Sequence, residues 1–168
     1  MRLERLEATQ RPEKLKAVFD GETLTVSASL CVQFSLCAGM ELDEAAFSAL
    51  KAAVAKEAAR ERAVRILTAS AVSERELEKR LLQKGMLPSD AADAVVWLKE
   101  HRFLDDAATA AQLVDSAVRK GYGRARVKNI LYEKGIPKDR WDEALARIPA
   151  MDDAIDRFLA AKLRGRTA

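Results

Sequence analysis

Residues 73–98 read SERELEKRLLQKGMLPSDAADAVVWL, and residues 123–148 read GRARVKNILYEKGIPKDRWDEALARI. The two segments align without a gap at an offset of 50 residues, so that Leu81 matches Leu131 and a Lys-Gly pair with an apolar residue follows in both. Similarity at a fixed period is typical of proteins built from stacked structural units. The sequence therefore predicts two copies of one unit, arranged in tandem.

Both copies carry the signals of a helix, a glycine turn and a second helix. Ser73 with Glu76 forms a capping box, which predicts the start of the middle helix of the first unit. Gly85 and Gly135 can adopt the left-handed backbone conformation that ends this helix in each copy. A proline follows each glycine within three residues and is typical of the first turn of a helix.

Each unit extends to a third helix on its N-terminal side. The same offset matches the apolar pair at 63–64 with the pair at 113–114. Asp105, with Asp106 beside it, follows a short apolar segment and predicts the N-cap of the first helix of the second unit. We therefore expect units of three helices.

The first 42 residues differ in pattern and predict a small β unit. Apolar side chains alternate over 15–19, and Asp20-Gly21 supplies a hairpin turn to a second strand. A lone hairpin is not stable and must pack on the next segment of the chain. In that segment three residues fall on one helical face: Leu30, Phe34 and Cys37. Gly39 is expected to end this helix.

A long helix is expected to join the N-terminal unit to the repeats. Asp43 is a good N-cap, and the helix should continue to about Ala69. Its apolar positions recur at helical spacing: Phe47, Leu50, Val54, Ala58 and Val64.

The expected fold is mainly α, with tandem three-helix repeats in an elongated array after a small β-hairpin and helix. We expect a hairpin and short helix in 1–42, the long helix and first repeat in 43–101, and the second repeat in 102–150. Residues 151–168 repeat the pattern of a first helix only and predict a truncated third repeat. Few aromatic residues, 5%, and many charged ones, 33%, suit thin helical cores.

Composition also indicates where the protein works. No run of about 18 apolar residues occurs, and the first residues are charged, so we expect a cytoplasmic protein without a membrane segment. We also expect it to be a monomer. Cys31 and Cys37 lie in the expected short helix, too far apart for a disulfide and too few for a metal site. Both are expected to be buried.

Basic residues gather in the second half of the chain. Residues 60–148 hold 18 basic and 14 acidic side chains, whereas 1–59 hold 7 and 9. An excess of this kind suits nucleic acid or an acidic partner, and we expect the middle helices of the two units to repeat one basic face. The candidate contacts to a partner or to DNA are Arg75, Lys79, Arg119, Lys120, Tyr122, Arg124, Arg126 and Lys128. The alternative is an ordinary solvated surface, with Glu76 paired to Arg80 and Glu74 near Lys79.

The sequence predicts no enzyme, cofactor or metal site. The single histidine, His101, has no nucleophile at a useful spacing and is expected to be an exposed turn residue. Gly121-Tyr122-Gly123 is too short for a phosphate-binding loop and is expected to be a turn before a helix. Neighbouring aspartates such as Asp105-Asp106 cap a helix more readily than they share an ion. Trp97 and Trp141 are expected to pack within the repeats.

Two segments resemble a known family. The runs AVRILTASAVSERELEKRLLQKG and LKEHRFLDDAATAAQLVDSAVRKGYGRARVKNILYEKGI are similar to the first two repeats of the RecX family of recombinase regulators. The resemblance covers roughly residues 60–148, and the region before it is similar to the N-terminal extension of longer members. It implies a curved helical body that lies in the groove of a RecA-type filament on single-stranded DNA. The activity implied is inhibition of ATP hydrolysis, strand exchange and coprotease activity, in recombination and the SOS response.

Two other functions remain open from the residues alone. A sequence-independent nucleic-acid-binding protein without a recombinase partner is compatible with the glycine-turned helix pairs and the basic residues. Tight binding to bare single- or double-stranded DNA, unchanged by recombinase, would favour this function. The other possibility is a scaffold that dimerises through the long helix near residues 43–69. It would form a stable dimer and bind neither DNA nor recombinase.

Overall fold

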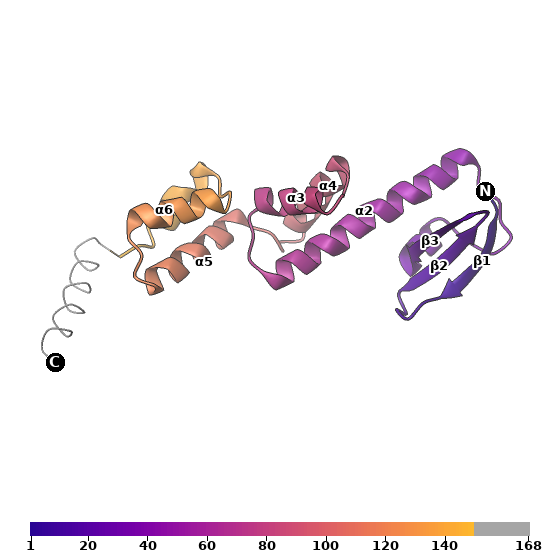
Figure 1. Cartoon of the computed structure of the whole chain (residues 1–168), viewed down its shortest axis with the longest axis horizontal. Helices are drawn as coiled ribbons and strands as arrows, with labels where there is room; N and C mark the ends of the chain where they lie inside the picture. The colour runs from indigo at the N-terminus through magenta and orange to yellow at the C-terminus, as the bar shows by residue number, and fades with distance from the viewer. Residues whose placement is uncertain (150–168) are drawn as a thin grey trace, which may run out of the picture.

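The computed structural model describes residues 1–149, and these form an elongated row of packed units (Figure 1). A small sheet lies at one end, the long helix α2 leads away from it, and the two helical repeats follow. The fold is mainly α, as the sequence predicts. Its elements are β1 (Leu3–Ala8), β2 (Lys14–Phe19), β3 (Glu22–Ser27), α1 (Ala28–Gln33), α2 (Glu44–Ala69), α3 (Glu74–Gln83), α4 (Pro88–Glu100), α5 (Asp106–Arg119), α6 (Arg124–Glu133), the 3-10 helix η1 (Lys138–Arg140) and α7 (Trp141–Leu145).

The N-terminal sheet has three antiparallel strands in the order β1-β2-β3. The hairpin of β2 and β3 turns at Asp20-Gly21, as predicted. The sequence does not predict strand β1, and the register of this strand explains why. The pairing shifts between Leu3 and Arg5, so that the apolar residues Leu3 and Leu6 are three apart along the chain. This irregularity removes the alternation by which a half-buried strand is recognised.

The short helix α1 ends earlier than its apolar spacing predicts. Ser35 takes the left-handed conformation with φ 50°, and the Leu36 N–H donates to the Cys31 carbonyl at 2.9 Å. Gly39 therefore does not end the helix, and Cys37 lies outside it. Cys31 is buried and its thiol pKa is raised by this burial, whereas Cys37 is exposed. The prediction of two buried cysteines is correct only for the first.

Helix α2 has 26 residues and begins where predicted, with the Asp43 side chain accepting from the Ala46 N–H at 2.7 Å. Its apolar side changes along its length. The first half packs on the sheet, but in the second half Ala59 and Ala63 are fully buried while the predicted positions Ala58 and Val64 are exposed. The stripe shifts because the second half packs on α4, a different partner from the sheet.

Both middle helices end in the predicted glycine turn. Gly85 and Gly135 are left-handed, with φ 86° and 74°. In the first repeat the Met86 N–H donates to the Leu81 carbonyl at 3.1 Å, and the equivalent bond in the second repeat is 3.0 Å. This pair of turns has the geometry of a Schellman motif.

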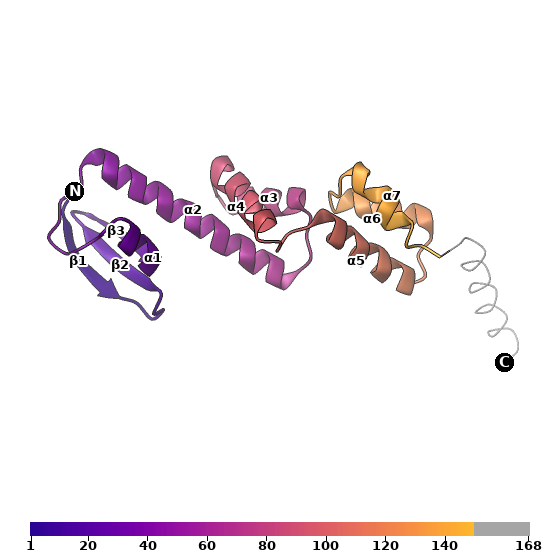
Figure 2. The ribbon, with the colours of Figure 1, turned by 180° about the vertical axis from the view of Figure 1, so that it is seen from behind.

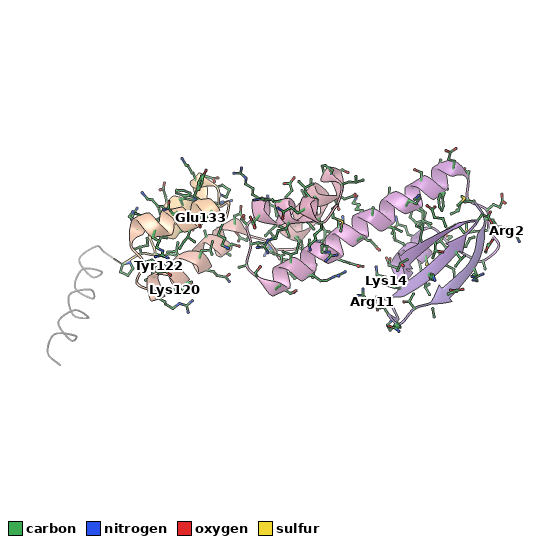
Figure 3. All side chains as sticks on the ribbon, in the orientation of Figure 1. Arg2, Arg11, Lys14, Lys120, Tyr122 and Glu133 are labelled. Carbon is green, nitrogen blue, oxygen red and sulfur yellow. The ribbon has the colours of Figure 1, made fainter. Side chains whose placement is uncertain are left out.

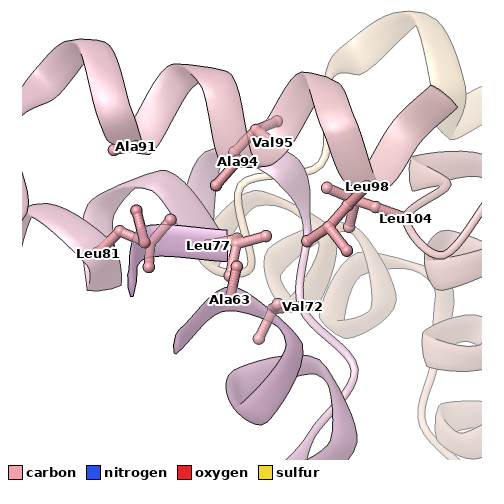
Figure 4. Close-up of a cluster of buried hydrophobic side chains, with 10 residues drawn as sticks. Ala63, Val72, Leu77, Leu81, Ala91, Ala94, Val95, Leu98 and Leu104 are labelled. Carbon is pink, nitrogen blue, oxygen red and sulfur yellow. The ribbon is translucent and has the colours of Figure 1, made fainter. Parts of the chain in front are cut away.

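Each repeat has its own apolar core. The first contains Leu77, Leu81 and Leu98, all without exposed surface (Figure 4). The second lies between α5, α6 and α7, and Figure 2 shows α6 and α7 together over α5. The third helix of the second repeat is short, because η1 precedes the five residues of α7.

The repeat is not uniform at 50 residues. The buried residues Ala63 and Val114 are 51 apart, whereas the buried Leu81 and Leu131 are 50 apart. The predicted match of 63–64 with 113–114 is therefore wrong by one residue. The predicted first helix of a third repeat, residues 151–168, lies outside the described residues.

Candidate partner-binding surface

The two repeats meet where the end of α6 abuts the start of α3, so that these helices follow one another along the molecule (Figure 1). Ser73, fully buried, joins them. Its Oγ accepts from the Glu76 N–H at 3.1 Å and donates to the Lys134 carbonyl. Ser73 thus caps one helix start and one helix end. The N-cap agrees with the sequence prediction, but the Glu76 carboxylate bonds Arg80 at 3.2 Å rather than completing a capping box.

Asp106 makes the second polar contact of this junction. Its Oδ1 accepts from the Glu74 N–H at 2.9 Å, although the two residues lie 32 apart in sequence. Asp105 caps α5 as predicted, accepting from the Ala107 N–H at 2.9 Å. Asp106 is buried, and this burial raises its pKa in spite of the Glu74 bond. The sequence predicts a cap for the pair, and only Asp105 forms it.

We expect Asp106 to make the stability depend on pH. A raised pKa means that the folded state favours the protonated carboxyl. The protonated Asp106 carboxyl then contributes to the free energy of unfolding. This contribution is fully present below the ordinary aspartate pKa of about 3.9, and it is lost as the pH rises through the pKa that Asp106 has in the folded protein. Asp106→Asn keeps the acceptor oxygen without the charge, and it should be at least as stable as the wild type near neutral pH.

Urea unfolding at about pH 7 and about pH 4 measures the difference in stability between the two proteins. The difference should shrink at the lower pH, because a larger fraction of the Asp106 carboxyl is protonated there. Asp106→Ala serves as the second variant. It leaves the Glu74 N–H without this acceptor and should lower the free energy of unfolding by about 1–3 kcal/mol. A stability difference between wild type and Asp106→Asn that widens on acidification would contradict the assignment.

A groove lies over the junction and has a volume of about 410 Å³. We call it the junction groove. Both repeats line it, with Arg75 and Glu78 from α3 on one side and Tyr132 from α6 on the other. The remaining lining residues are Glu74, Val95, Asp106, Gly135, Ile136, Pro137, Lys138 and Trp141. A second hollow of about 500 Å³ continues along α3 and shares Arg75 and Glu78 with the first.

The eight candidate contact residues are spread over α3, the end of α5, the turn after it and α6, rather than gathered in one patch. Arg75 and Lys79 lie on α3 beside the two hollows. The other six lie at the end of α5, in the turn after it and along α6. Figure 3 shows Lys120 and Tyr122 close together below α6. The Arg126 guanidinium carbon stands 3.9 Å from the centre of the Tyr122 ring, a cation–π contact.

All seven basic candidates are exposed, and none forms an ion pair with another residue in the range 1–149. The alternative, an ordinary solvated surface, predicts two ion pairs on α3, and only one of them forms. Glu76 pairs with Arg80 at 3.2 Å as predicted, but Glu74 pairs with Lys99 at 3.2 Å and not with Lys79. None of the basic candidates is therefore held in an ion pair by a described neighbour.

The prediction that the middle helices repeat one basic face is wrong. The buried leucines align α3 and α6 at an offset of 50, which puts Arg124 at the position of Glu74 and Lys128 at that of Glu78. A one-residue difference turns a side chain by about 100° around a helix. Equivalent positions thus carry opposite charges, and the two repeats present different surfaces.

The residues rejected as catalytic lie where the sequence predicts. His101 is exposed at the end of α4, with Nδ1 2.8 Å from the Trp97 carbonyl oxygen. Gly121-Tyr122-Gly123 forms the turn into α6, and both tryptophans pack against the repeat cores. Within residues 1–149 no group of His, Cys, Asp or Glu side chains has the arrangement of a metal site.

None of the helices in the described part of the chain is both long enough and apolar enough to cross a membrane.

Comparison with known proteins agrees with this architecture. A model described as the RecX first three-helix domain matches residues 59–98, and one described as the RecX second three-helix domain matches 105–145. The crystal structure of a regulatory protein RecX superposes with a TM-score of 0.73 and 25% identity, covering 88% of this chain and 74% of that one. The chain belongs to the RecX family.

Curated relatives named regulatory protein RecX are identical to this chain at about a third of the aligned residues. The regulatory protein RecX of Cronobacter sakazakii is 35% identical over 96 residues, which is 51% of this chain and 58% of the relative. That of Shigella dysenteriae serotype 1 is 36% identical over 95 residues, 51% of this chain and 57% of the relative. The matched part thus spans little more than half the length of these RecX proteins.

Proposed function

We propose that this RecX family member binds a RecA-type recombinase filament on single-stranded DNA and inhibits its ATPase, strand-exchange and coprotease activities. It would act in the cytoplasm, as a monomer, in recombination and the SOS response. The observation that carries the proposal is the row of two RecX repeats with seven exposed basic side chains that form no ion pair within residues 1–149.

The shape of the molecule supports a filament as partner. A filament repeats its surface, so an elongated body can contact neighbouring subunits at once, and several weak contacts then add through a high effective concentration. The two repeats present different charges at equivalent positions, Glu74 against Arg124 and Glu78 against Lys128. They therefore suit two different places on the filament better than two copies of one place.

The test is DNA-dependent ATP hydrolysis by a RecA-type recombinase with this chain titrated in, together with co-sedimentation of the chain with the filament. We expect inhibition and co-sedimentation. Reversing the charges of Arg124 and Lys128 together should weaken both inhibition and co-sedimentation. Complementary charges across an interface contribute to binding, and reversed charges would repel the partner. Reversal of Arg11 and Lys16, exposed residues of the N-terminal unit, is the control. No inhibition and no co-sedimentation by the wild type would refute the proposal.

Nucleic-acid binding without a recombinase is the second candidate. It is favoured by the Arg126–Tyr122 stack beside Arg119, Lys120 and Arg124, since aromatic and cationic side chains together suit single-stranded nucleic acid. Affinity for bare single-stranded DNA distinguishes the two functions. If that affinity is high, falls steeply with salt and is unchanged by recombinase, the second function holds.

A further inference from the structure

We propose that the junction groove is the docking site for an acidic peptide segment with a large apolar side chain, supplied by the protein partner. The inference rests on the proposed function, in which that partner is the recombinase. The inference specifies where on this chain the partner binds and the chemical character of the partner's segment. The apolar residues on which the inference depends were not among the contact residues expected from the sequence.

One wall of the groove is apolar and exposed. Tyr132 is 72% exposed and is not part of the apolar core of the second repeat. Beside it lie Pro137 and Trp141, whose indole Nε1 already donates to the Ile136 carbonyl at 2.8 Å. The Trp141 ring therefore needs no further polar partner. An aromatic ring left in water at the edge of an apolar wall is typical of the residues that dominate binding at protein interfaces.

Both repeats also contribute positive charge to the groove. Arg75 of α3 and Lys138 of η1 line it, and Lys79 lines the hollow that continues from it. None of the three forms an ion pair with another residue in 1–149. Carboxylates of a bound segment would form charge-assisted hydrogen bonds with these groups, and Arg75 can bind one with two parallel bonds.

Negative groups in the same groove disfavour a nucleic acid. Three carboxylates line the groove. Glu74 is paired with Lys99, and Asp106 accepts from the Glu74 N–H. Glu78 lines both hollows without an ion pair to another residue in 1–149, and the carbonyl end of α6 faces the junction. A phosphate backbone would meet these groups at regular intervals and be repelled. A peptide can instead place a backbone N–H or hydroxyl against Glu78 and its carboxylates against Arg75. The mixture of charges therefore favours protein as the partner.

The length of the site indicates an extended segment. The two hollows join at Arg75 and Glu78 and run along α3 to Leu82, which is 42% exposed. Apolar surface thus lies at both ends, at Tyr132 and at Leu82, with basic residues between them. We expect the bound segment to carry apolar side chains toward its two ends and acidic ones in the middle.

Photo-crosslinking tests the assignment on the full chain. Tyr132 is replaced by p-benzoylphenylalanine, the variant is bound to a RecA-type filament on single-stranded DNA and irradiated, and the crosslinked segment is mapped by mass spectrometry. Phe103 is 67% exposed but does not line the groove, so the same replacement there is the matched control. We expect a crosslink from position 132, and not from 103, to a recombinase segment of net negative charge.

Affinity gives an independent measurement. Tyr132→Ala should weaken co-sedimentation about tenfold or more, whereas Phe103→Ala should leave it unchanged. If the wild type co-sediments but position 132 crosslinks to DNA, or to nothing, the groove is not the peptide site and the proposed function stands. If the wild type does not co-sediment at all, the proposed function fails and this inference fails with it.

Discussion

Replacing Ser73 by alanine is expected to lower the free energy of unfolding by about 2–3 kcal/mol, more than the loss of a helix cap alone. The Ser73 hydroxyl does two things in a fully buried position. It accepts from the Glu76 N–H at the start of α3 and donates to the Lys134 carbonyl at the end of α6. The alanine variant therefore loses an N-cap and removes the partner of a carbonyl in the other repeat.

The control for Ser73→Ala is Asp43→Ala. The Asp43 side chain caps α2 through the Ala46 N–H and makes no other hydrogen bond to residues 1–149, so its loss should cost about 1 kcal/mol. Urea unfolding of both variants gives the comparison. Equal losses would mean that the bond from Ser73 to Lys134 contributes nothing to the junction.

Replacing Leu81 by alanine is expected to cost about 2–5 kcal/mol of the free energy of unfolding. Leu81 has no exposed surface and lies in the core of the first repeat, so alanine leaves a cavity among residues that cannot fully close it (Figure 4). Met86, the residue after the glycine turn, packs against the same core. Loss of the Leu81 side chain therefore also removes part of the apolar contact that accompanies this turn.

The neighbouring residue supplies the control for Leu81→Ala. Leu82 lies on the same helix and is 42% exposed, so Leu82→Ala should cost less than about 1 kcal/mol. The two variants change the same atoms at adjacent positions, and the difference reports burial alone. Comparable losses from both would show that the first repeat is not packed as described. Leu82 lies in the second hollow, so its variant also tests filament binding with little loss of stability.

The local features of the repeats were predictable because each depends on a few neighbouring residues. A serine three residues before a glutamate, and a glycine after a helical turn of leucines, specify where α3 begins and ends whatever surrounds them. The same holds for Asp43 at α2 and Asp105 at α5. Ser35 shows the limit of this reasoning. It takes the left-handed position expected of a glycine, so α1 ends before Gly39.

The candidate surface was predictable only as a set of residues. Charge and position in the repeat identified Arg75, Lys79 and the residues around Tyr122, and the structure places the basic ones at the surface and Tyr122 half-buried. That Tyr132 faces a groove was not predictable in the same way. The one available signal was an aromatic residue off the apolar stripe of its helix, beside the buried Leu131. Many such residues are merely solvated, so the signal had little weight without the neighbouring repeat.

By itself the sequence determined the repeat, the helix ends within the repeats, the hairpin and the family resemblance, because these depend on residues that are close along the chain. Only the tertiary structure decided how the repeats meet. Ser73 bonds a carbonyl 61 residues away, and Glu74 bonds Asp106 across 32 residues. The face that α2 buries and the residues that line the junction groove were likewise decided by the tertiary structure. Each depends on how separately formed units pack, and that placement is not encoded in any short segment.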